Sequence, residues 1–171
     1  MKVIGAVLVM VASCGIGFLF AGELIKRKRN LEEQYSLMSL LLGDIRYMRA
    51  TLPEAISKAI TRHRGCYDLF LKAVLEMLCE GSGKSLAEVW IMAVEKGLKQ
   101  SALTESDKQQ LRQFGEAIEF SDRENIVMCF EQYLGVLKEE ISEINRVVRT
   151  KTRLYRSLGV LAGVFIVVLF I

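Results

Sequence analysis

Apolar residues fill both ends of the chain and recur at helical spacing between them. Residues 3–22 include no charged residue, and as a helix they would be about 30 Å long, the thickness of a hydrocarbon core. Residues 158–171 are also apolar, and starting at Leu154 lengthens that segment to about 27 Å. We therefore expect an N-terminal transmembrane anchor at 1–25, a helical body at 26–153 and a C-terminal transmembrane segment at 154–171.

Each end has a second interpretation. The first segment could be a cleavable signal peptide, but its basic start is Lys2 alone and a run of four basic residues follows at 26–29. The second segment is short for a span and could be a buried or interfacial helix. Basic residues adjoin both segments on the side of the body, and short basic loops stay on the cytoplasmic side of membranes. The body is therefore predicted to be cytoplasmic.

Small residues recur at four-residue spacing in both apolar segments. Such a stripe lets two helix backbones approach closely in lipid, although glycine is also simply common in membrane helices. The predicted membrane packing residues are Ser13, Gly17, Ala21, Gly159 and Gly163.

Capping patterns divide the body into helices. Thr51–Glu54, Ser85–Glu88 and Ser121–Glu124 each place a hydroxyl three residues before a glutamate, which is the pattern of a capping box. Thr104 is expected to cap a further helix. The predicted short helices run from Thr51 to near Gly65, from Cys66 to Glu80, from Ser85 to Gly97, and from Thr104 with Leu111, Phe114, Gly115 and Ile118 facing inward. In the helix over 66–80 we expect Leu69, Phe70, Ala73, Val74, Met77 and Leu78 to face the core.

Two long helices should frame these short ones. The first anchor is predicted to continue as helix toward Met48, with Leu31, Leu37, Leu40, Leu41 and Ile45 on one face. The last helix should start after Ser121 and run to the end of the chain. Its apolar residues alternate three- and four-residue steps, as in a coiled-coil seam, at 126, 130, 133, 137, 141, 144 and 148. We expect this seam to pack against the first long helix, which gives an all-α, membrane-anchored bundle with about four shorter helices between the two long ones.

Charge is distributed unevenly although the net charge is only +3. Residues 30–145 contain 13 basic and 19 acidic residues, a formal charge of −6. Nucleic-acid binding proteins carry positive charge on the folded body. The sequence therefore argues against nucleic-acid binding.

Gly81-Ser-Gly-Lys-Ser85 resembles the end of a phosphate-binding loop, but the full motif needs a glycine at position 78, which is Leu78, and a preceding strand. A helix connector is the preferred interpretation, and a nucleotide-binding regulator using 81–85 is the alternative. The four cysteines are not spaced for zinc and there is one histidine. We expect the cysteines to be reduced and small core residues, and we predict no metal, no cofactor and no enzymatic activity.

Several local motifs resemble the stage III sporulation protein AB family of endospore-forming bacteria, and the resemblance covers essentially the whole chain. The most specific is the tail from Arg153 to Gly163, Arg-Leu-Tyr-Arg-Ser-Leu-Gly-Val-Leu-Ala-Gly. The others are Leu52–Ala55, Ser85–Glu88 after a Gly-Ser-Gly loop, Leu103–Asp107, Phe114-Gly115 and Ser121-Asp122.

This resemblance implies a function. The helical part of that family is similar to the F domain of type II secretion and type IV pilus platform proteins, which dock a secretion-type ATPase. It implies an adaptor in the channel complex between mother cell and forespore, placed in the mother-cell membrane around the forespore, with the stage III sporulation protein AA ATPase as partner. The candidate partner-binding residues are Asp107, Gly115, Asp122 and Glu124, although Asp107 and Asp122 could simply cap helices. A self-associating membrane spacer is a further alternative.

Overall fold

A computed structural model gives the fold of the chain. It describes the backbone of residues 2–62, 65–80, 83–119 and 121–170, and the side chains of 22–62, 65–80, 83–119, 121–122 and 124–150. Within these ranges the structure has six helices and no strand, so the all-α prediction is confirmed there. The helices are α1 (Lys2–Tyr47), α2 (Leu52–Arg62), α3 (Asp68–Cys79), α4 (Leu86–Gly97), α5 (Glu105–Glu119) and α6 (Arg123–Phe170).

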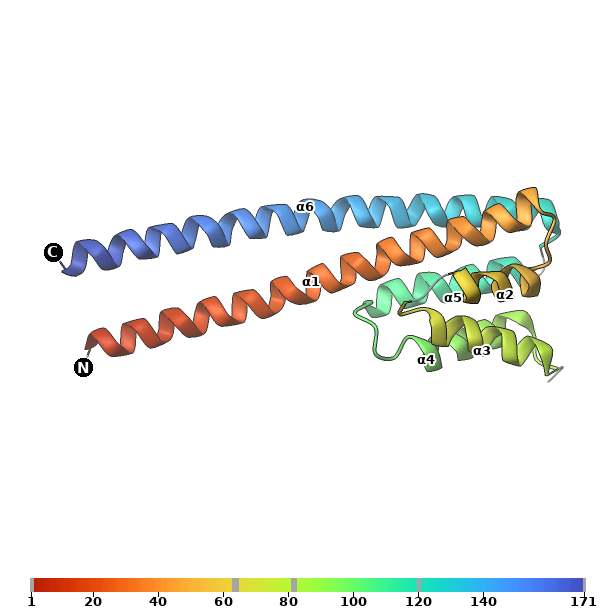
Figure 1. Cartoon of the computed structure of the whole chain (residues 1–171), viewed down its shortest axis with the longest axis horizontal. Helices are drawn as coiled ribbons and strands as arrows, with labels where there is room; N and C mark the ends of the chain where they lie inside the picture. Colours follow the sequence, from red (N-terminus) through yellow and green to blue (C-terminus); the bar gives the residue numbers. More distant parts are fainter. Residues whose placement is uncertain (1, 63–64, 81–82, 120, 171) are drawn as a thin grey trace.

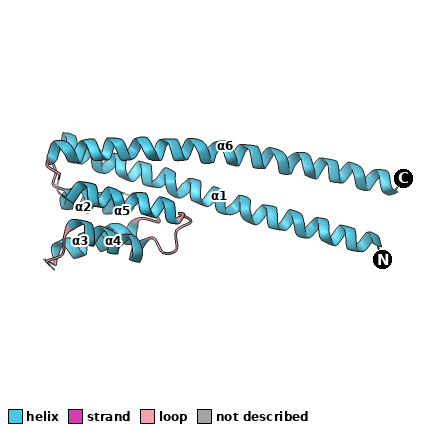
Figure 2. Ribbon diagram, turned by 180° about the vertical axis from the view of Figure 1, so that it is seen from behind, coloured by secondary structure: helices cyan, strands magenta, loops and turns pink. Residues whose placement is uncertain are grey.

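The two long helices, α1 and α6, run side by side in opposite directions. Their outer ends, which are the two termini of the chain, lie at the same end of the molecule, and α2–α5 pack beside the other half (Figures 1 and 2). In the described residues, each helix packs on the next one in the chain, and the contact between α1 and α6 closes the circuit.

The predicted seam of α6 forms the contact with α1. Phe130, Tyr133, Leu137 and Ile144 are buried, and Ile126, Ile141 and Val148 pack against the core at its edge. Opposite them, α1 contributes buried Leu31, Leu37, Leu41 and Ile45. The predicted face of this helix and its predicted contact with the first long helix are therefore both confirmed in the described residues.

Two of the predicted helix starts are confirmed. Ser85 accepts a hydrogen bond from the Glu88 amide at 3.2 Å, and the Glu88 carboxylate accepts one from the Ser85 amide at 3.1 Å. Before α2, the Glu54 carboxylate accepts a hydrogen bond from the Thr51 amide at 2.9 Å. Each bond satisfies an amide that has no partner within its own helix.

The third predicted capping box is wrong by one residue. Asp122, and not Ser121, caps α6, because its carboxylate accepts a hydrogen bond from the Asn125 amide at 3.0 Å. The Ser121 hydroxyl instead donates back to the Ala117 carbonyl at the end of α5. A short aspartate can serve as the cap as well as a serine, so the adjacent pair left the choice of cap open.

Two burial predictions also fail. Leu69 is 67% exposed in the first turn of α3, where Phe70 and Leu71 are buried instead. Cys79 is exposed and Cys66 and Cys129 are only partly buried, so these three free cysteines are not core residues.

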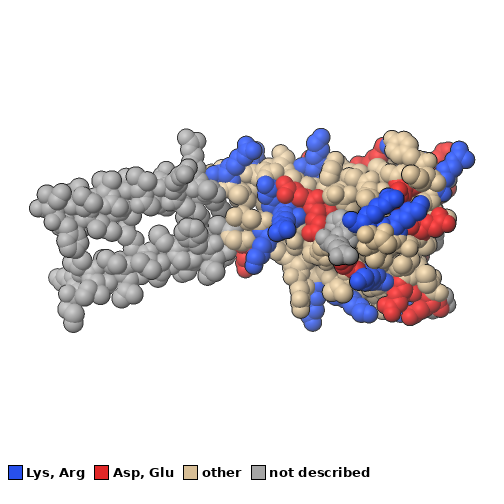
Figure 3. All heavy atoms as spheres, viewed as in Figure 1, with Lys and Arg blue, Asp and Glu red and all other residues tan. Residues whose placement is uncertain are grey.

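Residues 1–21 and 154–171 of the predicted membrane segments fall outside the residues whose side chains are described, and so do the packing residues Ser13, Gly17, Ala21, Gly159 and Gly163. In the described part of the chain, no helix combines the length and apolar character needed to cross a membrane. Lysine and arginine side chains gather where the described parts of α1 and α6 end (Figure 3).

Candidate functional site

Asp107 lies at the start of α5, where it satisfies the helix terminus together with Thr104. The Asp107 carboxylate accepts a hydrogen bond from the Thr104 amide at 2.8 Å, and the Thr104 hydroxyl accepts one from the Asp107 amide at 3.2 Å. This reciprocal pair confirms that Thr104 caps the helix, and it adds an aspartate in the position that a capping box usually gives to glutamate.

The same carboxylate binds an arginine from the opposite side of the bundle. Arg27 of α1 donates from Nε and from a terminal nitrogen to the two oxygens of Asp107, at 2.8 and 2.7 Å. The terminal nitrogen also donates to Glu140 of α6 at 3.1 Å. One guanidinium therefore joins α1, α5 and α6, and we call Arg27, Asp107 and Glu140 the ionic node.

Burial and hydrogen bonding act in opposite directions on Asp107, whose side chain is 1% exposed. Burial raises the pKa of its carboxyl, but the hydrogen bonds from Arg27 and Thr104 outweigh that effect and hold the pKa below its usual value. The hydrogen bond to Asp107 likewise raises the pKa of Arg27. Both groups are therefore charged at neutral pH.

A buried polar contact lies beside the ionic node along the seam. Gln34 of α1 donates its side-chain amide to the Tyr133 hydroxyl of α6 at 2.6 Å, and both residues are buried. Burial raises the pKa of the Tyr133 phenol far above its usual value, so this side chain is neutral. A polar pair inside an apolar seam fixes the register between two helices, because a shift would leave buried donors without acceptors.

Gly115 of α5 lies against Trp90 of α4. A Cβ atom at this position would come within 2.4 Å of the Trp90 ring. The Trp90 indole lies against this gap and donates to the Leu111 carbonyl of α5 at 3.0 Å. Gly115 is thus needed for packing, and neither it nor Asp107, which is 2% exposed, presents a side chain to a partner.

Asp122 and Glu124 are exposed and lie at the start of α6. Asp122 caps that helix, as its alternative interpretation held. The four sequence candidates therefore separate into two groups: Asp107 and Gly115 hold the helices in place, while Asp122 and Glu124 are available on the surface.

Sequence reasoning did not single out Arg27, Glu140 or Gln34. Arg27 was counted only among the basic residues that follow the anchor, and Glu140 is one of many acidic residues on α6. The one available signal was Gln34, a polar residue inside the apolar stripe of α1, which needs a partner when buried.

The loop at 81–85 gives the nucleotide interpretation no added support. Gly81 and Ser82 lie outside the described residues, as does His63. The loop joins two helices, and the Ser85 hydroxyl, which a phosphate-binding loop would use for magnesium, already caps α4. In the described ranges no group of three or more histidine, cysteine, aspartate or glutamate side chains could hold a metal ion.

Comparisons with known proteins agree with one another. The family model described as Stage III sporulation protein AB matches residues 2–171. The chain is 24% identical to Stage III sporulation protein AB of Bacillus subtilis (strain 168) over 169 residues, which are 99% of this chain and 98% of that protein. It is also similar to a solved structure of Stage III sporulation protein AB (SpoIIIAB), with a TM-score of 0.65 and 20% identity, over 72% of this chain and 97% of that one.

Proposed function

This chain belongs to the stage III sporulation protein AB family, and from that premise we propose that it is a non-enzymatic membrane adaptor in a secretion-like channel complex of endospore formation. In this role it holds a cytoplasmic secretion-type ATPase, of the stage III sporulation protein AA type, at the mother-cell membrane around the forespore. The body receives force or a conformational change from the ATPase and transmits it to the membrane helices.

The observation that carries the proposal is the arrangement of α1 and α6. Both long helices leave the short-helix body in the same direction and end together (Figure 1). Residues 3–22 are free of charge and 158–171 are apolar, as segments that enter a bilayer must be. Basic residues adjoin both segments on the side of the body, which supports a cytoplasmic body.

The ionic node supports transmission through the body. Arg27 lies two residues after the predicted anchor, and it binds the start of α5 and the middle of α6. A displacement of α5 therefore acts on both long helices. Rigid helices joined by directional contacts pass on such a displacement better than a loop does.

The opposite end of the body offers the docking surface. Tyr47 and Met48 are 80% and 67% exposed where α1 ends, and this is also the end where α6 begins with exposed Asp122 and Glu124. Large exposed apolar residues near charged ones are typical of protein interfaces. We call these four residues the distal surface, because the chain termini lie at the other end (Figure 2).

The turn that presents Met48 is held in place. Arg49 has a φ of 53°, in the left-handed region that residues other than glycine rarely adopt. The Met48 and Ala50 amides both donate to the Asp44 carbonyl, at 3.1 and 3.2 Å. These bonds fix the turn, so the distal surface is ordered before any partner binds.

The proposal is tested by binding between the full-length chain in mild detergent and the ATPase of the same organism. We expect Tyr47→Ala with Met48→Ala to weaken binding by about tenfold or more, since central aromatic contacts often exceed 1 kcal/mol. Leu69→Ala is the matched control. Leu69 is as exposed as Met48, but it lies on α3 and is not part of the distal surface. Absence of any association at physiological salt would refute the adaptor role, and unchanged binding of the double variant would refute the distal surface.

A further inference from the structure

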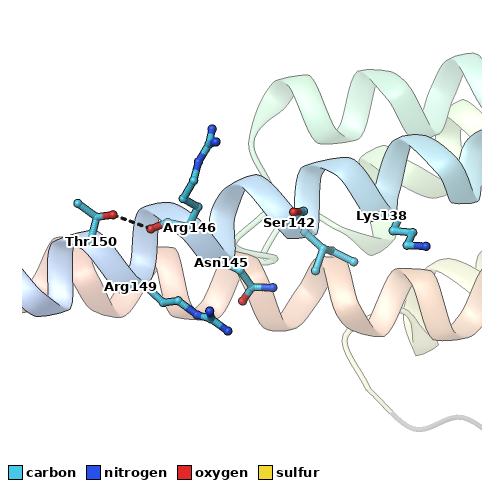
Figure 4. A pocket seen from close by; sticks show the side chains of 7 residues that line it. Lys138, Ser142, Asn145, Arg146, Arg149 and Thr150 are labelled. Carbon is cyan, nitrogen blue, oxygen red and sulfur yellow. Dashed lines mark hydrogen bonds between the residues drawn. The ribbon is translucent and has the colours of Figure 1, made fainter.

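Near its predicted membrane segment, α6 carries three cationic side chains that have no ion-pair partner among the described residues. Lys138, Arg146 and Arg149 line a cavity of about 530 Å³, together with Ser142, Asn145 and Thr150 (Figure 4). In the described part of the chain no carboxylate lies within ion-pair distance of these three cations. Arg27, Arg46, Arg62 and Arg112, by contrast, all have carboxylate partners.

Acidic residues are near in sequence but do not neutralise these cations. Glu140 binds Arg27 on the side of α5, and exposed Glu139 and Glu143 do not line the cavity. The unpaired positive charge is therefore local, although the body as a whole is acidic.

The donors suit a phosphate group. Guanidinium groups form paired hydrogen bonds to phosphate oxygens, and the Asn145 amide and Ser142 hydroxyl are further donors beside them. Figure 4 shows Asn145 and Arg149 pointing to one side of α6, about one turn apart, and Arg146 pointing to the other side, so the two arginines flank the cavity. Thr150 contributes less, because its hydroxyl donates to the Arg146 carbonyl at 2.9 Å.

Distance along α6 identifies the source of the phosphate. Arg149 is five residues before Leu154, about 8 Å along the helix, and a headgroup layer is roughly 5 to 8 Å deep. Arg146 is about 12 Å from Leu154, within reach of that layer for a long side chain, whereas Lys138 is about 24 Å away. We propose that Arg146 and Arg149, with Asn145, bind the phosphate of an anionic phospholipid headgroup. This inference rests on the proposed membrane placement.

The experiment measures lipid retention by the full-length chain. The chain is purified in neutral detergent and supplied with equal amounts of phosphatidylglycerol and phosphatidylcholine, and native mass spectrometry gives the ratio of the two bound species. We expect preference for phosphatidylglycerol to fall about fivefold with Arg149→Gln and about 30-fold with Arg146→Gln and Arg149→Gln together. Lys138→Gln removes the same charge from the same cavity, and it should change the preference for phosphatidylglycerol less than twofold.

Other outcomes would overturn the inference. An unchanged preference in the double variant would show that these arginines do not bind lipid. An equal effect of Lys138→Gln, with displacement of lipid by inorganic phosphate, would assign the cavity to a soluble anion. Flotation of the wild-type chain with phosphatidylcholine vesicles tests the membrane placement separately. A chain that floats but shows no lipid preference refutes only this inference, and a chain that binds neither vesicle nor lipid refutes both.

Discussion

Arg27 donates hydrogen bonds to both carboxylate oxygens of Asp107, although the two residues lie 80 positions apart in the chain. The pair joins α1, two residues after the predicted anchor, to the capped start of α5. Because the Asp107 side chain is almost fully buried, a change in either partner leaves the other charge poorly solvated.

Replacing Asp107 with asparagine should destabilise the fold by about 2 to 3 kcal/mol, since it removes a buried charge partner of Arg27 and weakens the cap of α5. The measurement is denaturant unfolding of the full-length chain in detergent. Glu140→Gln is the control and should cost less than about 1 kcal/mol, because Glu140 is partly exposed and makes one bond at 3.1 Å. Equal effects of the two variants would contradict the central place of Asp107 in the ionic node.

Stability should also depend on pH through Asp107. Its pKa in the folded chain lies below the usual value, and an unfolded aspartate titrates near pH 3.9. The contribution of the carboxylate is therefore complete above about pH 4 and is lost as the pH falls through the folded pKa. Unfolding midpoints followed from pH 7 to strongly acidic pH should fall more steeply for the wild type than for Asp107→Asn. Parallel curves would contradict the assignment.

Gly115→Ala should destabilise the chain by about 2 to 4 kcal/mol, because the new methyl group would overlap the Trp90 ring and force α4 and α5 apart. Gly135→Ala is the matched control: it is a helical glycine on α6 with open space around it. That change should stabilise the helix by about 0.5 to 1 kcal/mol. Thermal unfolding of both variants in the same detergent separates the steric overlap at Gly115 from the general effect of replacing a helical glycine with alanine.

Tyr133→Phe should cost about 1 to 3 kcal/mol, because it leaves the buried Gln34 amide without its acceptor. Combining it with Gln34→Met removes the unpaired amide and should restore much of the stability. A double-mutant cycle on unfolding free energies gives the coupling. Additive effects of the two changes would show that the hydrogen bond does not contribute.

Cys66 should resist alkylation at pH 8 far more than Cys79. Burial and the nearby Glu33 carboxylate raise the pKa of the Cys66 thiol to about 12, and the thiolate is the reactive form. Cys79 is exposed. Timed iodoacetamide labelling with peptide mapping should therefore show modification of Cys79 at least about 100-fold faster, and equal rates would contradict the burial of Cys66.

The sequence was informative where local rules apply. Spacing of apolar residues identified the seam through Phe130 and Leu137, and hydroxyl–glutamate spacing located the starts of α2 and α4. Both signals arise from contacts within a few residues or along one helix face. They also gave the inward face of α5, including Gly115.

The ionic node could not be found in the same way. Periodicity shows which face of a helix is buried but not which charged residue of another helix lies opposite, so Arg27 and Glu140 had no signature. Ser121 and Asp122 are adjacent and equally suitable as helix caps by local sequence. The Ser121 hydroxyl donates to the Ala117 carbonyl at the end of α5, and Asp122 caps α6. Leu69 shows the same limit, since it lies at helical spacing from buried Ala73 and is nevertheless exposed.

The circuit of helix contacts has a consequence for folding during synthesis. Most contacts join helices that are neighbours in the chain and can form as each one leaves the ribosome. The contact between α1 and α6 is the exception, since α6 is the last helix to be made. Until then α1 packs on α2 but lacks α6, so a nascent chain stalled before Arg123 would expose the part of the apolar face of α1 that packs on α6, and it would be the species most prone to aggregate or to need a chaperone.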